Sequence, residues 1–312
     1  MKRLAALATM IALLGSALTP APEVINVMPS FWRVWDSSTG EPLGVRVDLF
    51  RTLVLKPNVR IYADQEFTND LSDSGIAGYL QSMRTRAPVV RALGERLTRG
   101  LPDYFSAFLR AFPDFRTDGV TIYVLPSFWH FNGAIREVGS KPAILLGPDG
   151  IAAFDGPRVN LGVAVVHELF HVYQIQLHPQ STLTMPTLGE AVWGEGLAAY
   201  VSQRVILGAT RAEALGKELA ALDDRSTRKL ACALAPHLGE PLTDELNTEY
   251  FDSGEHPMGL PARGAYLIGY SVAKRLNARR DLRDLALLQG IPLRNAITGN
   301  VRALCTSGNR RR

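Results

Sequence analysis

Two histidines and a glutamate stand together in one apolar stretch of the chain, within the run His-Glu-Leu-Phe-His of residues 167–171. On an α-helix, residues four apart share a face, so the imidazoles of His167 and His171 would project in the same direction. Two imidazoles so placed can bind one zinc ion at about 2.0–2.1 Å. Glu168 would lie beside the ion and could take a proton from a water that zinc activates. The spacing therefore predicts the zinc centre of a hydrolytic enzyme.

The flanks of this motif indicate a buried helix. Residues 161–177 are strongly apolar around the polar triplet, with Val163 to Val166 before it and Val172 and Tyr173 after it. Burying two imidazoles and a carboxylate without partners costs several kcal/mol, and a bound metal removes most of that cost. An exposed helix that happens to carry two histidines is the alternative, and the apolar flanks count against it.

The elements around the motif indicate an α+β fold with a small sheet and many helices. Residues 120–125 are β-branched and aromatic between Gly119 and Pro126, and residues 143–147 are apolar before a Pro-Asp-Gly turn, so both runs predict strands. Beyond residue 205 the pattern predicts helices, at about 212–222, 228–235, 265–278 and 282–288.

The first third of the chain has a weaker pattern. Alternation over residues 44–50 indicates a strand. Residues 76–112 carry apolar side chains at helical spacing, and Pro88 and the Gly-Leu-Pro sequence at 100–102 predict breaks between shorter helices.

A second segment resembles a known family. The run Trp-Gly-Glu-Gly-Leu-Ala-Ala-Tyr of residues 193–200 is similar to the second helix of gluzincin-type metallopeptidases, in which a Glu-Gly-x-Ala segment donates the third zinc ligand. The resemblance implies that Glu195 completes the site with His167 and His171. Pro186 and Thr187 supply a start for that helix. Glu190 is the rival ligand, and it lies about 140° around the helix from Glu195, so the two carboxylates cannot face one ion.

The resemblance extends to a later helix and has one departure. Gluzincins commonly use a late Tyr or His to stabilise the tetrahedral oxyanion, which implies Tyr266 or Tyr270 here, with His256 as an alternative. Many carry an Asp four residues after the third ligand, where this chain has Ala199. The metzincin pattern does not fit, because His178 comes seven residues after His171 rather than six, with no glycine between.

The resemblance implies a zincin-like catalytic domain with a small antiparallel sheet and a largely helical remainder. It also implies that the strand near residues 143–146 could bind an extended peptide by edge pairing. We expect a signal peptide at residues 1–21, a mostly helical region at 22–118 and the catalytic region at 119–312. The signal peptide is indicated by Lys2-Arg3, a short apolar run and small residues before Pro20. No cysteine follows that run and no other stretch is apolar enough to span a bilayer, so we expect a secreted or periplasmic protein without a stable membrane span.

Composition limits the class of partner. The 312 residues are 46% hydrophobic and 21% charged, which is typical of a globular protein. The formal charge of +4 comes partly from the chain ends, and no block of Lys and Arg interleaved with aromatic residues indicates nucleic-acid binding. The only cysteines, Cys232 and Cys305, would form one disulfide or remain two buried thiols.

Together these observations predict an exported zinc metallopeptidase that hydrolyses a peptide or protein substrate with Glu168 as general base. The alternatives are a zinc hydrolase of non-peptide amides or esters, and an exported binding protein that keeps the zinc fold without activity. A purely structural zinc site has no use for a base such as Glu168, which counts against the last alternative.

Overall fold

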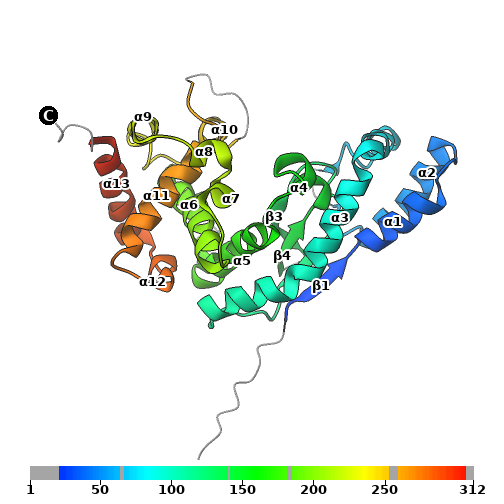
Figure 1. Ribbon diagram of the computed structural model, residues 1–312, viewed down its shortest axis with the longest axis horizontal. Coiled ribbons are helices and arrows are strands. Elements are labelled where there is room, and N and C mark those ends of the chain that lie inside the picture. Colours follow the sequence, from blue (N-terminus) through cyan, green and yellow to red (C-terminus); the bar gives the residue numbers. More distant parts are fainter. Residues whose placement is uncertain (1–20, 64–66, 140, 181–184, 253–258, 307–312) are drawn as a thin grey trace, which may run out of the picture.

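A computed structural model describes residues 21–63, 67–139, 141–180, 185–252 and 259–306. Within these residues the chain forms thirteen α-helices and one four-stranded sheet, which confirms the predicted α+β class. Figure 1 shows the sheet with α1–α4 on one side of the central helix α5, and α6–α13 on the other. The predicted signal peptide lies, apart from Ala21, outside the described residues.

The sheet is mixed, so the prediction of an antiparallel sheet is wrong. Its order is β1 (Glu23–Asn26), β2 (Thr121–Val124), β4 (Lys141–Leu146) and β3 (Gly133–Val138), in which β1, β2 and β4 are parallel and only β3 is antiparallel to its neighbour. The two strands predicted at residues 120–125 and 143–147 are present, as β2 and β4. They run parallel because β3, which the sequence did not reveal, lies between them in the chain and returns it to the starting end of the sheet.

The edge strand is β3 and not β4. Ala143 to Leu146 of β4 are buried between β2 and β3, and this burial on both faces accounts for the unbroken apolar run. The expectation that the strand at 143–147 offers an edge to a peptide is therefore wrong, and the edge on that side belongs to β3.

The N-terminal region contributes β1 to the same sheet and then turns helical. Helix α1 (Met28–Ser37) is followed by α2 (Leu43–Phe50), a π-turn (Arg51–Leu55) and a 3₁₀ turn (Lys56–Asn58). The strand predicted at 44–50 is thus wrong. Val47, Phe50 and Val54 are buried, and their spacing of three and four places them on one helical face, which outweighs the local alternation.

Helix α3 (Asp73–Ala111) runs unbroken through Pro88 and Pro102, so the predicted breaks are also wrong. Each internal proline removes a hydrogen bond and costs about 3 kcal/mol in an isolated helix. The buried face continues across both prolines, through Val90, Leu97 and Leu101, and its burial offsets that cost.

The predicted metal motif lies on α5, which stands between α4 and α6 in the chain. Helix α4 (Pro148–Phe154) follows β4, and α5 (Leu161–Leu177) begins at Asn160, whose side chain accepts the Val163 N–H. Helix α6 (Leu188–Val205) begins at Thr187 in a capping box with Glu190, which confirms the predicted helix start.

The remaining helices follow α6 in the chain. They are α7 (Arg211–Leu215), α8 (Lys217–Ala220), α9 (Asp224–Leu234), α10 (Asp244–Tyr250), α11 (Gly264–Asn277), α12 (Leu282–Ala286) and α13 (Gly290–Thr306). Helices α6 and α11 cross where Gly196 meets Gly269, and a Cβ on either glycine would collide with backbone of the other helix. The absence of a side chain at Gly196, directly after Glu195, therefore allows α11 to pack closely against α6.

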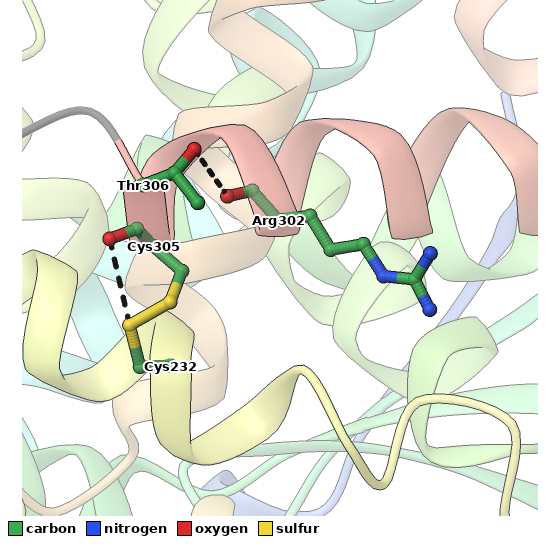
Figure 2. Close-up of a disulfide and its surroundings, with 4 residues drawn as sticks. All are labelled: Cys232, Arg302, Cys305 and Thr306. Carbon is green, nitrogen blue, oxygen red and sulfur yellow. Dashed lines mark hydrogen bonds between the residues drawn. A yellow bond between two sulfur atoms is a disulfide. The ribbon is translucent and has the colours of Figure 1, made fainter. Parts of the chain in front are cut away.

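A disulfide joins Cys232 of α9 to Cys305 at the end of α13, with Cα atoms 4.8 Å apart (Figure 2). Of the two possibilities that the sequence left open, the structure shows the bonded one. The bond closes a loop of 73 residues and holds the last helix against the body.

We expect the Cys232→Ser, Cys305→Ser double variant to unfold with about 2–4 kcal/mol less stability, because the open chain regains the entropy that the loop removes. Urea denaturation of both proteins with and without reductant measures this. Wild-type protein should lose stability on reduction, whereas the double variant should not respond. Equal unfolding midpoints for oxidised wild type and the double variant would show that the bond contributes nothing.

No helix in the described part of the chain combines the length and apolarity needed to cross a membrane.

Candidate metal centre

Three side chains from two helices converge on one point. His167 and His171 project from α5 and Glu195 from α6, and their donor atoms lie within 4.8 Å of one another. The Nε2 atoms of the two imidazoles are 3.0 Å apart, and Oε2 of Glu195 lies 3.2 Å from that of His167 and 3.4 Å from that of His171. Zinc bound tetrahedrally at about 2.0–2.1 Å separates its ligand atoms by about 3.3–3.4 Å. The three donors therefore fit one face of a zinc coordination sphere.

Glu190, the rival ligand, is engaged elsewhere. Its Oε2 accepts the backbone N–H of Thr187 at 2.9 Å and the Thr187 hydroxyl at 3.0 Å, which completes the cap of α6. Its other oxygen faces Arg294 of α13 at 3.5 Å. The described residues thus place Glu195 with the two histidines and assign Glu190 to holding the helix start.

Gln174 orients one of the imidazoles. Its side-chain oxygen, as the amide is oriented here, lies 3.2 Å from Nδ1 of His171. An amide oxygen only accepts, so Nδ1 donates to it, and Nε2, on the side of Glu195 and His167, is the nitrogen that would bind a metal once its own proton is displaced. Gln174 lies three residues after His171 on the same helical face, a spacing that sequence reasoning could have noticed. Ala199, where many gluzincins have Asp, is fully buried and offers no polar side-chain group.

Charges are strongly coupled within the triad. Burial opposes protonation of His171, but the Glu195 carboxylate and, less strongly, Glu168 and Gln174 outweigh it and raise the pKa of His171 to about 9. Burial likewise opposes ionisation of Glu195, and its imidazole neighbours hold the pKa of that carboxyl well below its usual range. Without metal the site is thus stabilised as an imidazolium beside a carboxylate. A cation that binds must displace the proton, as expected for ligands that a metal takes over.

Glu168 lies beside the triad and against the first residue of β3. Burial raises its pKa, and the neighbouring imidazoles of His167 and His171 oppose that rise. A Cβ built on Gly133 would stand 2.6 Å from Oε1 of Glu168, closer than such atoms approach. Only glycine at position 133 therefore lets the carboxylate occupy this place. Gly133 is a residue of the site that the sequence pattern did not indicate.

We expect Gly133→Ala to displace the Glu168 carboxylate while the three donor atoms keep their positions. Hydrolytic activity should fall at least about tenfold, since a misplacement of about 1 Å can cost 100-fold, and zinc content should stay at the wild-type value. Gly78→Ala is the matched control, because Gly78 lies in α3 with open space around its Cβ position. Equal activity of Gly133→Ala and wild type would show that this contact does not hold Glu168 in place.

A buried carboxylate fixes the loop that leads into β3. Asp149 of α4 is fully buried, and it accepts the backbone N–H and hydroxyl of Ser127, the N–H of Trp129 and the hydroxyl of Tyr79. Burial raises the pKa of Asp149, and these donors oppose the rise. Phe128 and Trp129 have positive φ, a conformation that needs such external support. The loop then ends at Asn132, which donates to Asp155 at 2.9 Å.

The two tyrosines of α11 go to different places. The Tyr266 ring stacks on His167 with centroids 6.3 Å apart and planes 20° apart, and burial and the Glu195 charge raise its pKa. The Tyr270 hydroxyl instead donates to Gln203 at 2.5 Å and lines a separate small cavity. The structure therefore brings Tyr266 to the metal site and leaves Tyr270 away from it. His256 lies outside the described residues.

One cavity of about 1470 Å³ contains the site. It follows α5 from Asn160 to His178, with β3 on one wall and α6 and α11 on the other, so that the triad, Glu168 and Tyr266 lie midway along it. Apolar and charged side chains both line the cavity, among them Ile175, Trp193 and Leu293 and the charged residues Arg158, Glu190 and Lys217.

Comparison with known proteins finds no matching family model, no matching curated protein and no matching solved structure.

Proposed function

We propose that this chain is a zinc-dependent metallopeptidase of gluzincin type. The observation that carries the proposal is the triangle of donor atoms from His167, His171 and Glu195, whose edges of 3.0–3.4 Å match a zinc coordination sphere. Two neutral nitrogens and one carboxylate are also the donor set of catalytic rather than structural zinc sites.

The position of Glu168 indicates hydrolysis. When bound, zinc would supply Lewis-acid activation of a water and of the scissile carbonyl. Glu168 stands next to the donors with a raised pKa, which suits a group that accepts a proton and later returns it. It would take the proton from the attacking water and pass it to the nitrogen of the leaving amine.

Tyr266 is placed to assist at the carbonyl oxygen. Its ring stacks on His167 and its pKa is raised, so the hydroxyl keeps its proton and can donate a hydrogen bond. A donor aimed at the developing oxyanion stabilises the tetrahedral transition state. We assign this role to Tyr266 and not to Tyr270, which donates to Gln203.

The cavity favours a peptide over a small amide or ester. It extends well beyond the triad in both directions along α5, and the edge strand β3 lines one wall beside Glu168. Backbone groups at a sheet edge can pair with an extended peptide, which would hold the scissile bond near the donors. The proposed substrate is therefore an extended peptide or an unfolded segment of a protein.

We further propose that the protein acts outside the cytoplasm. The disulfide between Cys232 and Cys305 is the supporting observation, because such bonds persist mainly in oxidising compartments. The charged and apolar character of residues 1–21 agrees with export.

Removal and return of the metal tests the function. We expect the zinc-loaded protein to cleave casein, to lose this activity after treatment with 1,10-phenanthroline and to regain it when zinc is added. Small acyl esters and amides should be cleaved more slowly. Cleavage of the small substrates without cleavage of casein would favour the non-peptide hydrolase, and casein cleavage that survives loss of the metal would overturn the proposal.

A further inference from the structure

We propose that Arg263 binds a carboxylate of the substrate, within about three residues of the scissile bond. This inference rests on the proposed peptidase function and names a substrate class for that site. Arg263 immediately precedes α11 and lines the same cavity as the triad and Glu168.

The backbone of Arg263 is held in an unusual conformation. Its φ is +56°, in the left-handed region that non-glycine residues rarely adopt. Two hydrogen bonds hold it there, from the Arg263 N–H to the Asp252 carbonyl and from the Tyr266 N–H to the Arg263 carbonyl. Asparagine or glycine would adopt this conformation with less strain, so the presence of arginine indicates a need for its side chain.

That side chain lies over the ring of Tyr266. The guanidinium carbon is 4.2 Å from the ring centroid, and the same ring stacks on His167. The guanidinium and a side chain of the triad therefore lie against the same aromatic ring. A carboxylate bound there would be within about three residues of a carbonyl at the metal, since an extended chain advances about 3.3–3.6 Å per residue.

The charge of Arg263 is not neutralised by an ion pair within the described part of the chain. Among the described residues, no carboxylate oxygen lies within ion-pair distance of its guanidinium. The nearby carboxylate of Asp155 already accepts a hydrogen bond from Asn132. A guanidinium presents five donors in a fixed plane and binds carboxylates in a bidentate manner, so an anionic group in the cavity is its natural ligand.

The carboxylate has two possible sources, the C-terminus of a peptide or an acidic side chain. Three acetylated tetrapeptides distinguish them. The first has uncharged side chains and a free C-terminal carboxylate, the second is its C-terminal amide, and the third is that amide with one internal Glu. Binding is measured by calorimetry on the zinc-loaded Glu168→Gln protein, so that no peptide is consumed and the readout does not depend on catalysis.

We expect at least one of the two carboxylate-bearing peptides to bind about 10- to 100-fold more tightly than the neutral amide, as charged bidentate hydrogen bonds would give. When Arg263→Asn is added to the Glu168→Gln protein, that preference should vanish. Asparagine is chosen because it tolerates the left-handed backbone at this position. Arg263→Lys should retain part of the preference. Arg158→Gln is the matched control, because Arg158 is an exposed arginine that lines the same cavity, and the preference should persist there.

Equal affinity for all three peptides, no binding of any of them, or a preference that survives Arg263→Asn would overturn the proposal. Failure of the proposed function appears in a different measurement, as absence of hydrolysis of all three peptides by the wild-type protein. A carboxylate preference without hydrolysis would therefore leave Arg263 as a binding residue and exclude the peptidase.

Discussion

Glu168→Gln is expected to reduce peptide hydrolysis by about 100- to 10,000-fold, the range that general acid–base catalysis contributes. Glutamine has nearly the same shape as glutamate, so it should fit the space beside Gly133 without disturbing the donor triangle. It cannot accept and return a proton at pH 7. The variant should therefore keep the zinc content of the wild type and its unfolding temperature.

The measurement combines the steady-state rate on a fluorogenic peptide with zinc quantification on the same preparation. Glu190→Gln is the matched control, because Glu190 is on α6 in the same cavity but serves the helix cap. It should keep zinc and most of the activity. If Glu168→Gln were as active as wild type, Glu168 would not be the base, and if it lost zinc together with activity, the role of Glu168 would be as a ligand.

The second large effect is on zinc affinity. Glu195→Ala removes one of the three donors, and we expect zinc affinity to fall more than about 100-fold, because losing a supporting group outside the coordination sphere already costs about 10- to 100-fold. Competition with a chromophoric chelator measures the change. Zinc should also raise the unfolding temperature of the wild type more than that of the variant, since a ligand stabilises the state that binds it.

Glu190→Ala distinguishes the two candidate ligands on the same helix. It should keep wild-type zinc affinity and lose about 1 kcal/mol of stability from the weakened cap of α6. The reverse pattern, in which Glu190→Ala loses zinc and Glu195→Ala keeps it, would assign the ligand to Glu190 and contradict the geometry described above.

The candidate site was largely predictable because its chemistry is local. The spacing of His167 and His171 places them on one face of a helix whatever the rest of the fold does. Thr187 and Glu190 mark the start of α6 through a capping box, which is also a local pattern. The position of Glu195 relative to the histidines came from the resemblance, and the described geometry agrees with it.

What the sequence did not reveal depends on contacts between distant segments. Gly133 gives no local sign that it faces Glu168, 35 positions further along the chain. Strand β3 has only one side chain that is fully buried, so it lacks the apolar run that marks β4, and the mixed order of the sheet follows from β3. Pro88 and Pro102 favour breaks when only local sequence is considered, because the burial of the long face of α3 depends on contacts with distant segments.

The two tyrosines illustrate the same limit. Tyr266 and Tyr270 are four apart on α11 and look equivalent in the sequence, but one ring stacks on His167 and the other meets Tyr200 edge to face. The close crossing at Gly196 and Gly269 sets how α11 lies on α6, and this crossing could not be located from the sequence.

The central claim is that one zinc ion binds between His167, His171 and Glu195, and X-ray absorption spectroscopy of zinc-loaded wild-type protein tests it most directly. Elemental analysis should give one zinc per chain, and the spectrum should show two imidazole nitrogens and a carboxylate oxygen at about 2.0–2.2 Å, with no sulfur ligand. The imidazole signal should be lost in His167→Ala. A wild-type protein that takes up no zinc, or zinc bound by sulfur or by oxygen alone, would contradict this account.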